Sequence, residues 1–159
     1  MTPSADPFSL EYPGHVFVFF SPPHWIALLF LLAIFGGLWL KRDWFSTPKI
    51  DLRTRWSIAI LLLGQELSLN IWHVSIGDWD AGSTLPLHLC GVGIVLAAFL
   101  VINRSYLLYE LVYFWGLGGA IQALLTPDIG VYGYPHYRFF QFFLSHGALI
   151  FASLYMTWI

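Results

Sequence analysis

The stretch from Thr84 to Val101, TLPLHLCGVGIVLAAFLV, is apolar along almost its whole length. It opens with two groups of a different kind, the imidazole of His88 and the thiol of Cys90, the chain's only cysteine. A helix that spans a membrane needs about 20 mostly apolar residues, and this stretch approaches that length. What an imidazole and a thiol do at its start depends on the solvent around the helix.

The composition of the whole chain indicates a membrane protein. Of the 159 residues, 58% are hydrophobic, 19% are aromatic and only 10% are charged. These fractions lie outside those of soluble domains. The formal net charge of -2 gives no reason to expect a nucleic-acid partner. At this length we expect a single transmembrane domain, 1–159, and one cysteine excludes an internal disulfide.

Four further apolar runs are separated by segments rich in charge, proline or glycine, such as KRDWFSTPKIDLR and IGDWDAGSTLP. Such segments end helices. The predicted fold class is therefore all-α, a polytopic bundle of about five transmembrane helices. The expected helices cover residues 24–40, 55–75, 86–102, 106–125 and 138–159. The first twenty residues lack a basic start and a cleavage site, so the first helix should be its own insertion signal.

The basic residues predict the orientation of the bundle. Six of them belong to the first and third connections: Lys41, Arg42, Lys49, Arg53, Arg55 and Arg104. Arg138 alone belongs to the opposite side. Because basic loops stay inside, we expect the amino terminus outside and Cys90 near the outer end of its helix.

Polar side chains from several helices share one level in this outer half. Ionisable groups are costly in hydrocarbon, so they mark sites by default. On the second helix, Glu66, Asn70 and His73 follow an i, i+4, i+7 spacing, which places them on one stripe. The other members of this level are Cys90, Gln122, Thr126, Asp128, His136, Arg138 and His146.

Cys90 and His146 are the candidate catalytic pair. A thiol in apolar surroundings is inert until a nearby base forms the thiolate. His88 lies about 200° around the helix from Cys90 and suits a structural hydrogen bond better. His146 comes from another helix at a compatible depth, with Asn70 or Glu66 to orient its ring. The alternatives are a small buried hydrophobe for Cys90 and a core histidine bonded to a helix carbonyl for His146.

Two other functions use the same side chains. A noncatalytic subunit or small-solute transport module would use the stripe of Glu66, Asn70 and His73, and a continuous polar path to the inner face would favour it. A metal-binding membrane protein would require Cys90, His73 and His146 to meet within ligand distance. The candidate ligands, which also include His88 and His136, lack tight ligand spacing, so we expect neither a metal nor a cofactor.

Three motifs in order, LPLHLCGVGIV, YFWGLGGAIQALLTPD and RFFQFFLSHGALI, resemble those of the YwaF-like integral membrane proteins, relatives of the eukaryotic transmembrane protein 164 acyltransferases. The resemblance is clear from Thr84 to Ile159 and looser over the first two helices. It implies an all-helical membrane protein. The eukaryotic relatives move a fatty acyl chain between phospholipids through a cysteine and a histidine. In this chain the motif residues are Cys90 in LHLC and His146 in LSHG.

The resemblance also implies a site and a setting. It implies that Gln122, Thr126, Pro127 and Asp128 of QALLTPD lie close to the Cys/His pair. The leading hypothesis is an acyltransferase or hydrolase of membrane phospholipids in a bacterial plasma membrane. Here Arg138 or His136 holds the lipid phosphate, and Gln122 or Thr126 stabilises the oxyanion. Family members usually continue with further helices, so we also expect a shortened member, a shortened product, or a site completed by a partner chain or homo-oligomer.

Overall fold

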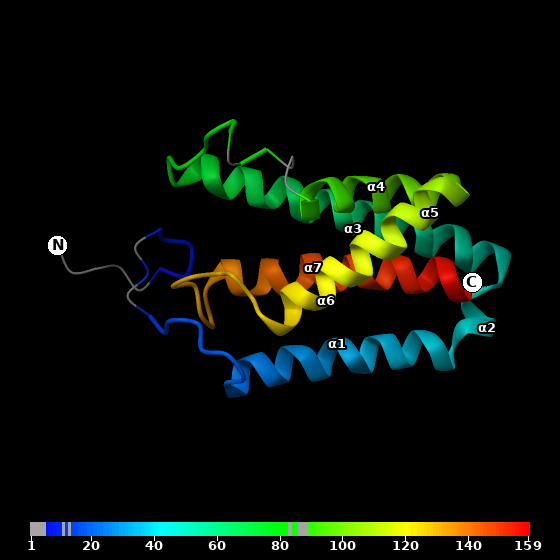
Figure 1. The fold of residues 1–159 in the computed structure, drawn as a ribbon, viewed down its shortest axis with the longest axis horizontal. Coiled ribbons are helices and arrows are strands. Elements are labelled where there is room, and N and C mark those ends of the chain that lie inside the picture. The colour runs from blue at the N-terminus through cyan, green and yellow to red at the C-terminus, as the bar shows by residue number, and fades with distance from the viewer. Residues whose placement is uncertain (1–5, 11, 13, 83, 86–88) are drawn as a thin grey trace.

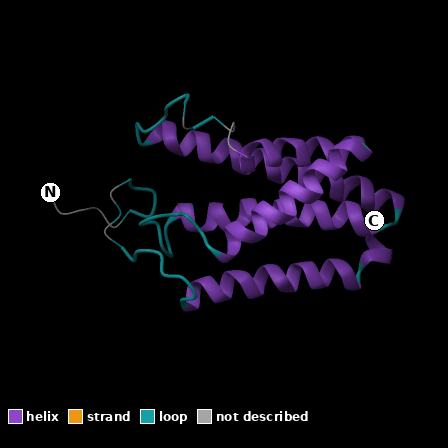
Figure 2. Cartoon of the chain, viewed as in Figure 1, coloured by secondary structure: helices purple, strands orange, loops and turns teal. Residues whose placement is uncertain are grey.

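The computed structural model describes residues 6–10, 12, 14–82, 84–85 and 89–159. Over these residues the regular structure is helical, without strands (Figure 2). The α-helices are α1 (Pro22–Leu40), α2 (Arg42–Phe45), α3 (Pro48–Ser75), α4 (Leu89–Asn103), α5 (Tyr106–Val112), α6 (Gly118–Leu125) and α7 (Tyr137–Trp158). A π-helical segment, η1 (Tyr113–Leu117), joins α5 to α6. The all-α prediction is confirmed.

The long helices lie side by side along the long axis of the molecule (Figure 1). Helix α7 occupies the centre and contacts α1, α3, α4, η1 and α6. Helix α3 packs mainly on α4 and α7, whereas α1 packs on α7 at the edge of the bundle. The long segments alternate in direction, so the loops after α3 and α6 lie at one end and the short breaks after α1 and α4 lie at the other.

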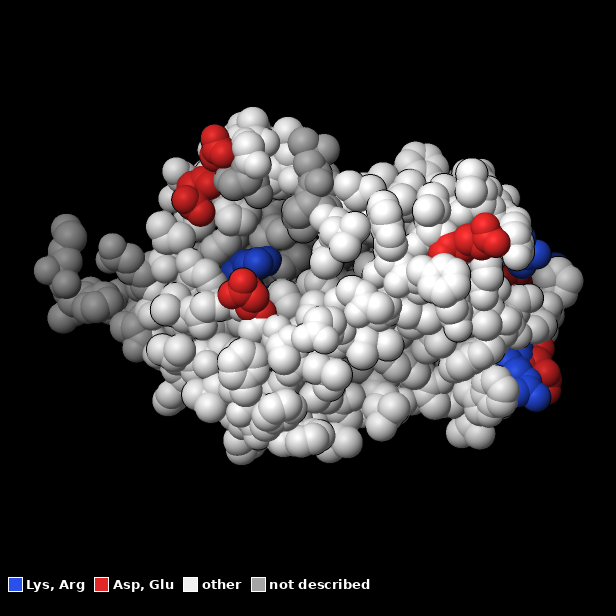
Figure 3. Space-filling view, in the orientation of Figure 1, with Lys and Arg blue, Asp and Glu red and all other residues white. Residues whose placement is uncertain are grey.

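Within the described residues, four segments are long and apolar enough to cross a membrane: α1, α3, the continuous stretch Tyr106–Leu125, and α7. Helix α4 has 15 residues in the described part of the chain. At about 1.5 Å per residue it covers roughly 22 Å of a hydrocarbon core of about 30 Å. On the face drawn in Figure 3, charged side chains lie toward the two ends, with uncharged surface between them. These features confirm a multi-pass helical membrane architecture.

Two helices depart from their predicted form. Helix α3 begins at Pro48, not at residue 55 as hydropathy indicated. Proline fits the first helical turn, where its missing N–H costs nothing, and the charged turns that follow extend the helix beyond the apolar run. The predicted fourth helix contains η1, a wide turn that sequence periodicity does not detect. A Cβ on Gly116 of η1 would lie 3.2 Å from Ser153 Oγ, so this glycine permits the close approach to α7.

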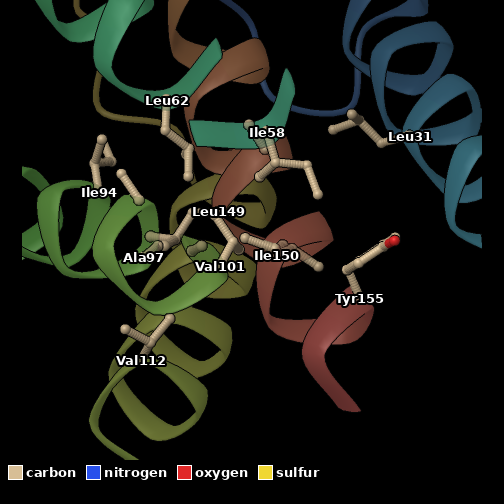
Figure 4. Packing of buried hydrophobic residues seen from close by; sticks show 14 of the residues in the cluster. Leu31, Ile58, Leu62, Ile94, Ala97, Val101, Val112, Leu149, Ile150 and Tyr155 are labelled. Atoms are coloured by element: carbon tan, nitrogen blue, oxygen red, sulfur yellow. The ribbon is translucent and has the colours of Figure 1, made fainter. Parts of the chain in front are cut away.

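The core is a single apolar cluster drawn mainly from α3, α4 and α7 (Figure 4). Leu149 and Ile150 of α7 are buried in it together with Leu62 of α3. Small residues of α4, among them Ala97 and Ala98, are fully or almost fully buried there. Small side chains at helix interfaces let backbones approach closely, which is how membrane helices gain contact area.

One buried carboxylate ties three helices together at the basic end of the bundle. Asp51 of α3 lies 3.2 Å from the Arg55 guanidinium and also pairs with Arg104. The hydroxyl of Tyr155 in α7 donates to Asp51 at 3.1 Å. Arg55 in addition donates to the carbonyl oxygen of Val101 at the end of α4, at 3.1 Å. This Asp51 cluster therefore fixes α3, α4 and α7 at one end, leaving the opposite end to the candidate site.

Candidate functional site

A cavity of about 440 Å³ lies between α3, α4, α6 and α7, at the end of the bundle opposite the Asp51 cluster. Figure 3 shows a hollow on this face with a basic side chain in it and an acidic group at its rim. Seven of the predicted site residues line the cavity: Glu66, Cys90, Gln122, Thr126, Asp128, Arg138 and His146. Side chains distant in the sequence thus share one chamber.

Cys90 reaches the cavity from the start of α4. It is the second helical residue that the structure describes there, and its free thiol is half-buried. Ile94, one turn further along the same face of α4, also lines the cavity and is buried. The thiol therefore lies at the boundary between the cavity and the apolar core.

His146 reaches the same cavity from α7, and its ring is held by its own helix. Nδ1 lies 2.9 Å from the carbonyl oxygen of Phe142, one turn earlier. A carbonyl only accepts, so Nδ1 carries a proton and Nε2 is the nitrogen that would be basic in a neutral ring. The Phe142 ring packs against the imidazole with centroids 4.2 Å apart. The helix-carbonyl bond expected of a core histidine is therefore present.

Arg138 enters the cavity from the first turn of α7. Its guanidinium donates to Gln141 Oε1 and lies over the ring of Trp72, 6.0 Å from the centroid. Gln141 Nε2 donates in turn to Gln65 Oε1 at 2.7 Å, a buried bond between α7 and α3. Four ion pairs join described residues, and Arg138 belongs to none of them. Its guanidinium is thus hydrogen-bonded to a neutral amide, in a cavity that Glu66 and Asp128 also line.

Sequence reasoning missed Gln141 and Gln65. Gln141 stands alone among aromatic residues in RFFQFF, which was a usable signal of a buried polar partner. Gln65 precedes Glu66 and lies about 100° around the helix from it, so it falls outside the polar stripe that Glu66 shares with Asn70 and His73. Only the packing of α7 against α3 shows that the two amides meet.

The rim of the cavity is formed at the end of α6. Gln122 Nε2 donates to Thr126 Oγ1 at 2.7 Å, and the Thr126 hydroxyl donates to the Gln122 carbonyl oxygen at 2.9 Å. Both side chains are exposed, as is Asp128 in the loop that follows. Gln122 retains a second amide N–H, so the rim offers a hydrogen-bond donor next to the open side of the cavity.

The predicted stripe on α3 does not reach the site as a unit, because only Glu66 lines the cavity. The Asn70 side chain donates to the Glu66 carbonyl oxygen at 3.1 Å and accepts from the Trp79 indole at 3.3 Å. His73 Nδ1 lies 3.3 Å from a carboxylate oxygen of Asp78. The loop after α3 therefore folds back onto the last turns of α3, where it contacts the side chains of Asn70 and His73. His88 lies outside the described residues.

His136 serves the fold at the start of α7 and does not line the cavity. Its Nδ1 accepts the backbone N–H of Arg138 at 3.0 Å, capping the helix. Its Nε2–H donates to the Ser9 carbonyl oxygen at 3.1 Å, which holds the N-terminal segment across this end. Burial lowers the pKa of His136, so the ring is neutral near pH 7. Of the two predicted phosphate ligands, Arg138 is the one at the cavity.

The metal and transport hypotheses gain no support from the described residues. Among them, no group of three His, Cys, Asp or Glu side chains lies close enough to hold a metal ion, so Cys90, His73 and His146 do not form one. Between the cavity and the Asp51 cluster the interior is packed with buried apolar side chains, among them Leu62 and Leu149. The described interior there is an apolar barrier.

The sequence of the whole chain carries a family signature that matches this architecture. A family model described as the TMEM164 family matches residues 19–159. The chain belongs to the TMEM164 family. The match extends over the first two helices, where the motif resemblance was looser. No curated protein and no solved structure matches the chain. TMEM164 family membership and four apolar spanning segments together identify an integral membrane protein.

Proposed function

We propose that this TMEM164 family protein is a phospholipid acyltransferase or acyl-lipid hydrolase in which Cys90 is the nucleophile and His146 the general base. The observation that carries the proposal is that the two side chains, from α4 and α7, line one cavity together with the cation of Arg138. A nucleophile, a base and an anchor for a phosphate are the parts that a phospholipid ester requires.

In the first half-reaction, His146 Nε2 accepts the proton of the Cys90 thiol. The thiolate attacks the carbonyl carbon of a phospholipid ester and forms a tetrahedral intermediate. The intermediate collapses by breaking the bond between carbon and the glycerol oxygen, and that oxygen takes the proton back from His146. A lysolipid leaves, and the acyl group remains as a thioester on Cys90.

In the second half-reaction, His146 Nε2 accepts the proton of the hydroxyl of a lysolipid, or of water. The oxygen attacks the thioester carbonyl, the carbon–sulfur bond breaks, and the Cys90 thiolate recovers the proton from His146. With a lysolipid the product is a new phospholipid, whereas with water it is a fatty acid. The acceptor that enters the cavity decides between transfer and hydrolysis.

Three further residues position the substrate in this scheme. Arg138 binds the phosphate, because a guanidinium that is hydrogen-bonded to a neutral amide at the cavity is suited to a phosphate oxygen. The second amide N–H of Gln122, or the Thr126 hydroxyl after rotation away from its helix carbonyl, stabilises the oxyanion of the tetrahedral intermediates. The Phe142 carbonyl keeps the His146 ring oriented through both steps.

The site lies in the outer half of the membrane in this proposal. The basic residues of the first and third connections stand at the end of the bundle away from the cavity. Since basic loops remain inside, the cavity and the amino terminus face the outside of a bacterial plasma membrane. The substrate is then a lipid of the outer leaflet.

An acyl-transfer assay tests the proposal. The full chain, purified in detergent, is given a phospholipid with a labelled acyl chain and an unlabelled lysophospholipid, and labelled products are separated by chromatography. The proposal predicts labelled phospholipid from the acceptor, or labelled fatty acid, and loss of both in Cys90→Ala. Ser153→Ala, which alters a buried side chain of α7 far from the cavity, should retain the activity. Equal turnover by the parent and Cys90→Ala would overturn the proposal.

A further inference from the structure

The hydrogen bonds that hold Arg138 have a fixed direction. A guanidinium only donates, so Gln141 must present its oxygen to Arg138 and its Nε2 to the next group. Gln65 then accepts that bond through Oε1 at 2.7 Å. Both glutamines are buried, with exposed fractions of 6%. The order Arg138, Gln141, Gln65 is therefore a relay that runs from the cavity into the interface of α7 and α3.

The chemistry of this relay suits the presentation of a positive charge. A carboxylate at position 141 would pair with the guanidinium directly, whereas the amide of glutamine orients it without adding a negative charge. The far end of the relay holds one further group, Gln65 Nε2, which is buried without a hydrogen-bond partner in the described part of the chain. Burying amides in this way is costly, so the arrangement favours a functional reason for their placement.

We propose that Gln141, held by Gln65, is a positioning residue that aims the Arg138 guanidinium at the phosphate of the lipid substrate. The inference rests on the proposed function in taking a phosphate as the anion at Arg138. It adds that phospholipids are selected over neutral lipids with the same acyl chains, and that the selection depends on two side chains outside the reacting atoms.

Binding in a Cys90→Ala background tests the relay without any acyl transfer. The full chain in detergent is titrated with radiolabelled dihexanoylphosphatidylcholine and, separately, with dihexanoylglycerol, which has the same chains and no phosphate. The parent should bind the phospholipid more tightly. Gln141→Met preserves length and burial but no longer accepts from Arg138. It should weaken phospholipid binding about tenfold and leave diacylglycerol binding unchanged.

Two further variants separate positioning from packing. Gln65→Met should weaken phospholipid binding in the same direction and by less, because it acts on Arg138 only through Gln141. Gln141→Glu keeps an acceptor for Arg138 but places a negative charge beside it, so it should weaken phospholipid binding and leave diacylglycerol binding unchanged. Asn103→Met, the matched amide change at the exposed end of α4, should leave both affinities unchanged.

The inference is overturned if Gln141→Met binds both lipids as the parent does, if it weakens both equally, or if the parent does not prefer the phospholipid. Thermal unfolding of each variant confirms that the comparison is made between folded proteins, and Gln65→Met replaces Gln141→Met if the latter does not fold. If Gln141→Met weakens only phospholipid binding, in a protein that shows no Cys90-dependent acyl transfer, this inference is supported and the proposed function is overturned.

Discussion

The imidazole of His146 donates its Nδ1–H to the carbonyl oxygen of Phe142, 2.9 Å away and one turn earlier in α7. Both partners of this bond belong to the same helix. The carbonyl has the orienting role that a carboxylate has in a catalytic triad, although it lacks the charge that would stabilise an imidazolium. In the proposed mechanism Nε2 is therefore the nitrogen that exchanges the proton with Cys90.

A change of His146 to glutamine should remove the base while leaving an amide that can still donate to the Phe142 carbonyl. We expect the rate of acyl transfer to fall by roughly 10²–10⁴-fold, the usual contribution of general acid–base catalysis. The initial rate of labelled product formation measures this change. Ser153→Ala is the matched control, because Ser153 Oγ also donates to a carbonyl one turn earlier, that of Leu149 at 3.0 Å. A full rate in His146→Gln would contradict the assignment.

His136 should make the docking of the N-terminal segment sensitive to pH. Burial lowers the pKa of His136 in the native state, whereas the unfolded ring keeps its ordinary value of about 6.5. Below about pH 6.5 the unfolded chain binds more protons than the native chain, so stability falls as the pH drops. The loss ends below the native pKa, where both states are protonated. Protonation of Nδ1 also breaks the bond from the Arg138 N–H.

Thermal unfolding of the full chain at several values between about pH 7.5 and about pH 5 measures this effect. His136→Gln offers an oxygen and an N–H to the same partners without titrating, so its slope against pH should be shallower. The protection of the amides at residues 6–10 against hydrogen exchange, relative to their intrinsic exchange rate at each pH, should decrease in acid in the parent and change less in the variant. Identical slopes in the two proteins would rule out His136 as the titrating group.

Asp51→Asn should destabilise the bundle at the end remote from the cavity. It removes the charge that compensates Arg55 and Arg104 and weakens the bond from Tyr155. Removing one partner of a buried ion pair costs about 3 kcal/mol. We expect a somewhat smaller loss here, because the Arg104 side chain is 50% exposed and water screens its charge. The free energy of unfolding in detergent reports the loss. Asp43→Asn, in an exposed pair with Arg42, should leave stability unchanged, and equal effects of the two changes would be inconsistent with the Asp51 cluster.

Gly133→Ala should displace the segment before α1. A Cβ on Gly133 would lie 2.1 Å from the His15 carbonyl oxygen and 3.0 Å from the Phe17 nitrogen. These are backbone atoms, so the clash is relieved only by moving the chain, at a cost of about 1–3 kcal/mol. Gly36→Ala in α1 meets nothing within 4 Å and should stabilise the helix by about 0.5–1 kcal/mol. Unfolding midpoints that move together in the two variants would contradict this packing.

Sequence predicted the helical fold well, because hydropathy reports directly on which segments can lie in hydrocarbon. It placed the start of α3 seven residues late, since charged turns such as those around Asp51 extend a helix beyond the apolar run. It could not find η1, whose extra residue per turn leaves no hydropathy signal.

The candidate site was predicted in part. Depth along each helix brought Cys90, His146 and Glu66 to one level, and they do line one cavity. Hydropathy and spacing do not give the rotation of a helix or the folding of a loop. Asn70 and His73, grouped with Glu66 by spacing, instead face the loop after α3, where Asn70 accepts from Trp79 and His73 lies near Asp78. Partners such as Gln65 and Gln141 depend on how α3 and α7 pack, which no local pattern encodes.

The acyl-enzyme intermediate is the most direct test of the proposed chemistry. The full chain is incubated with a phospholipid carrying an isotopically labelled acyl chain and no acceptor, and its intact mass is measured. We predict one added acyl group, released by neutral hydroxylamine, absent in Cys90→Ala and strongly reduced in His146→Ala. An acyl adduct that persists in Cys90→Ala, or the lack of any adduct in a preparation that turns over phospholipid, would contradict a thioester mechanism at Cys90.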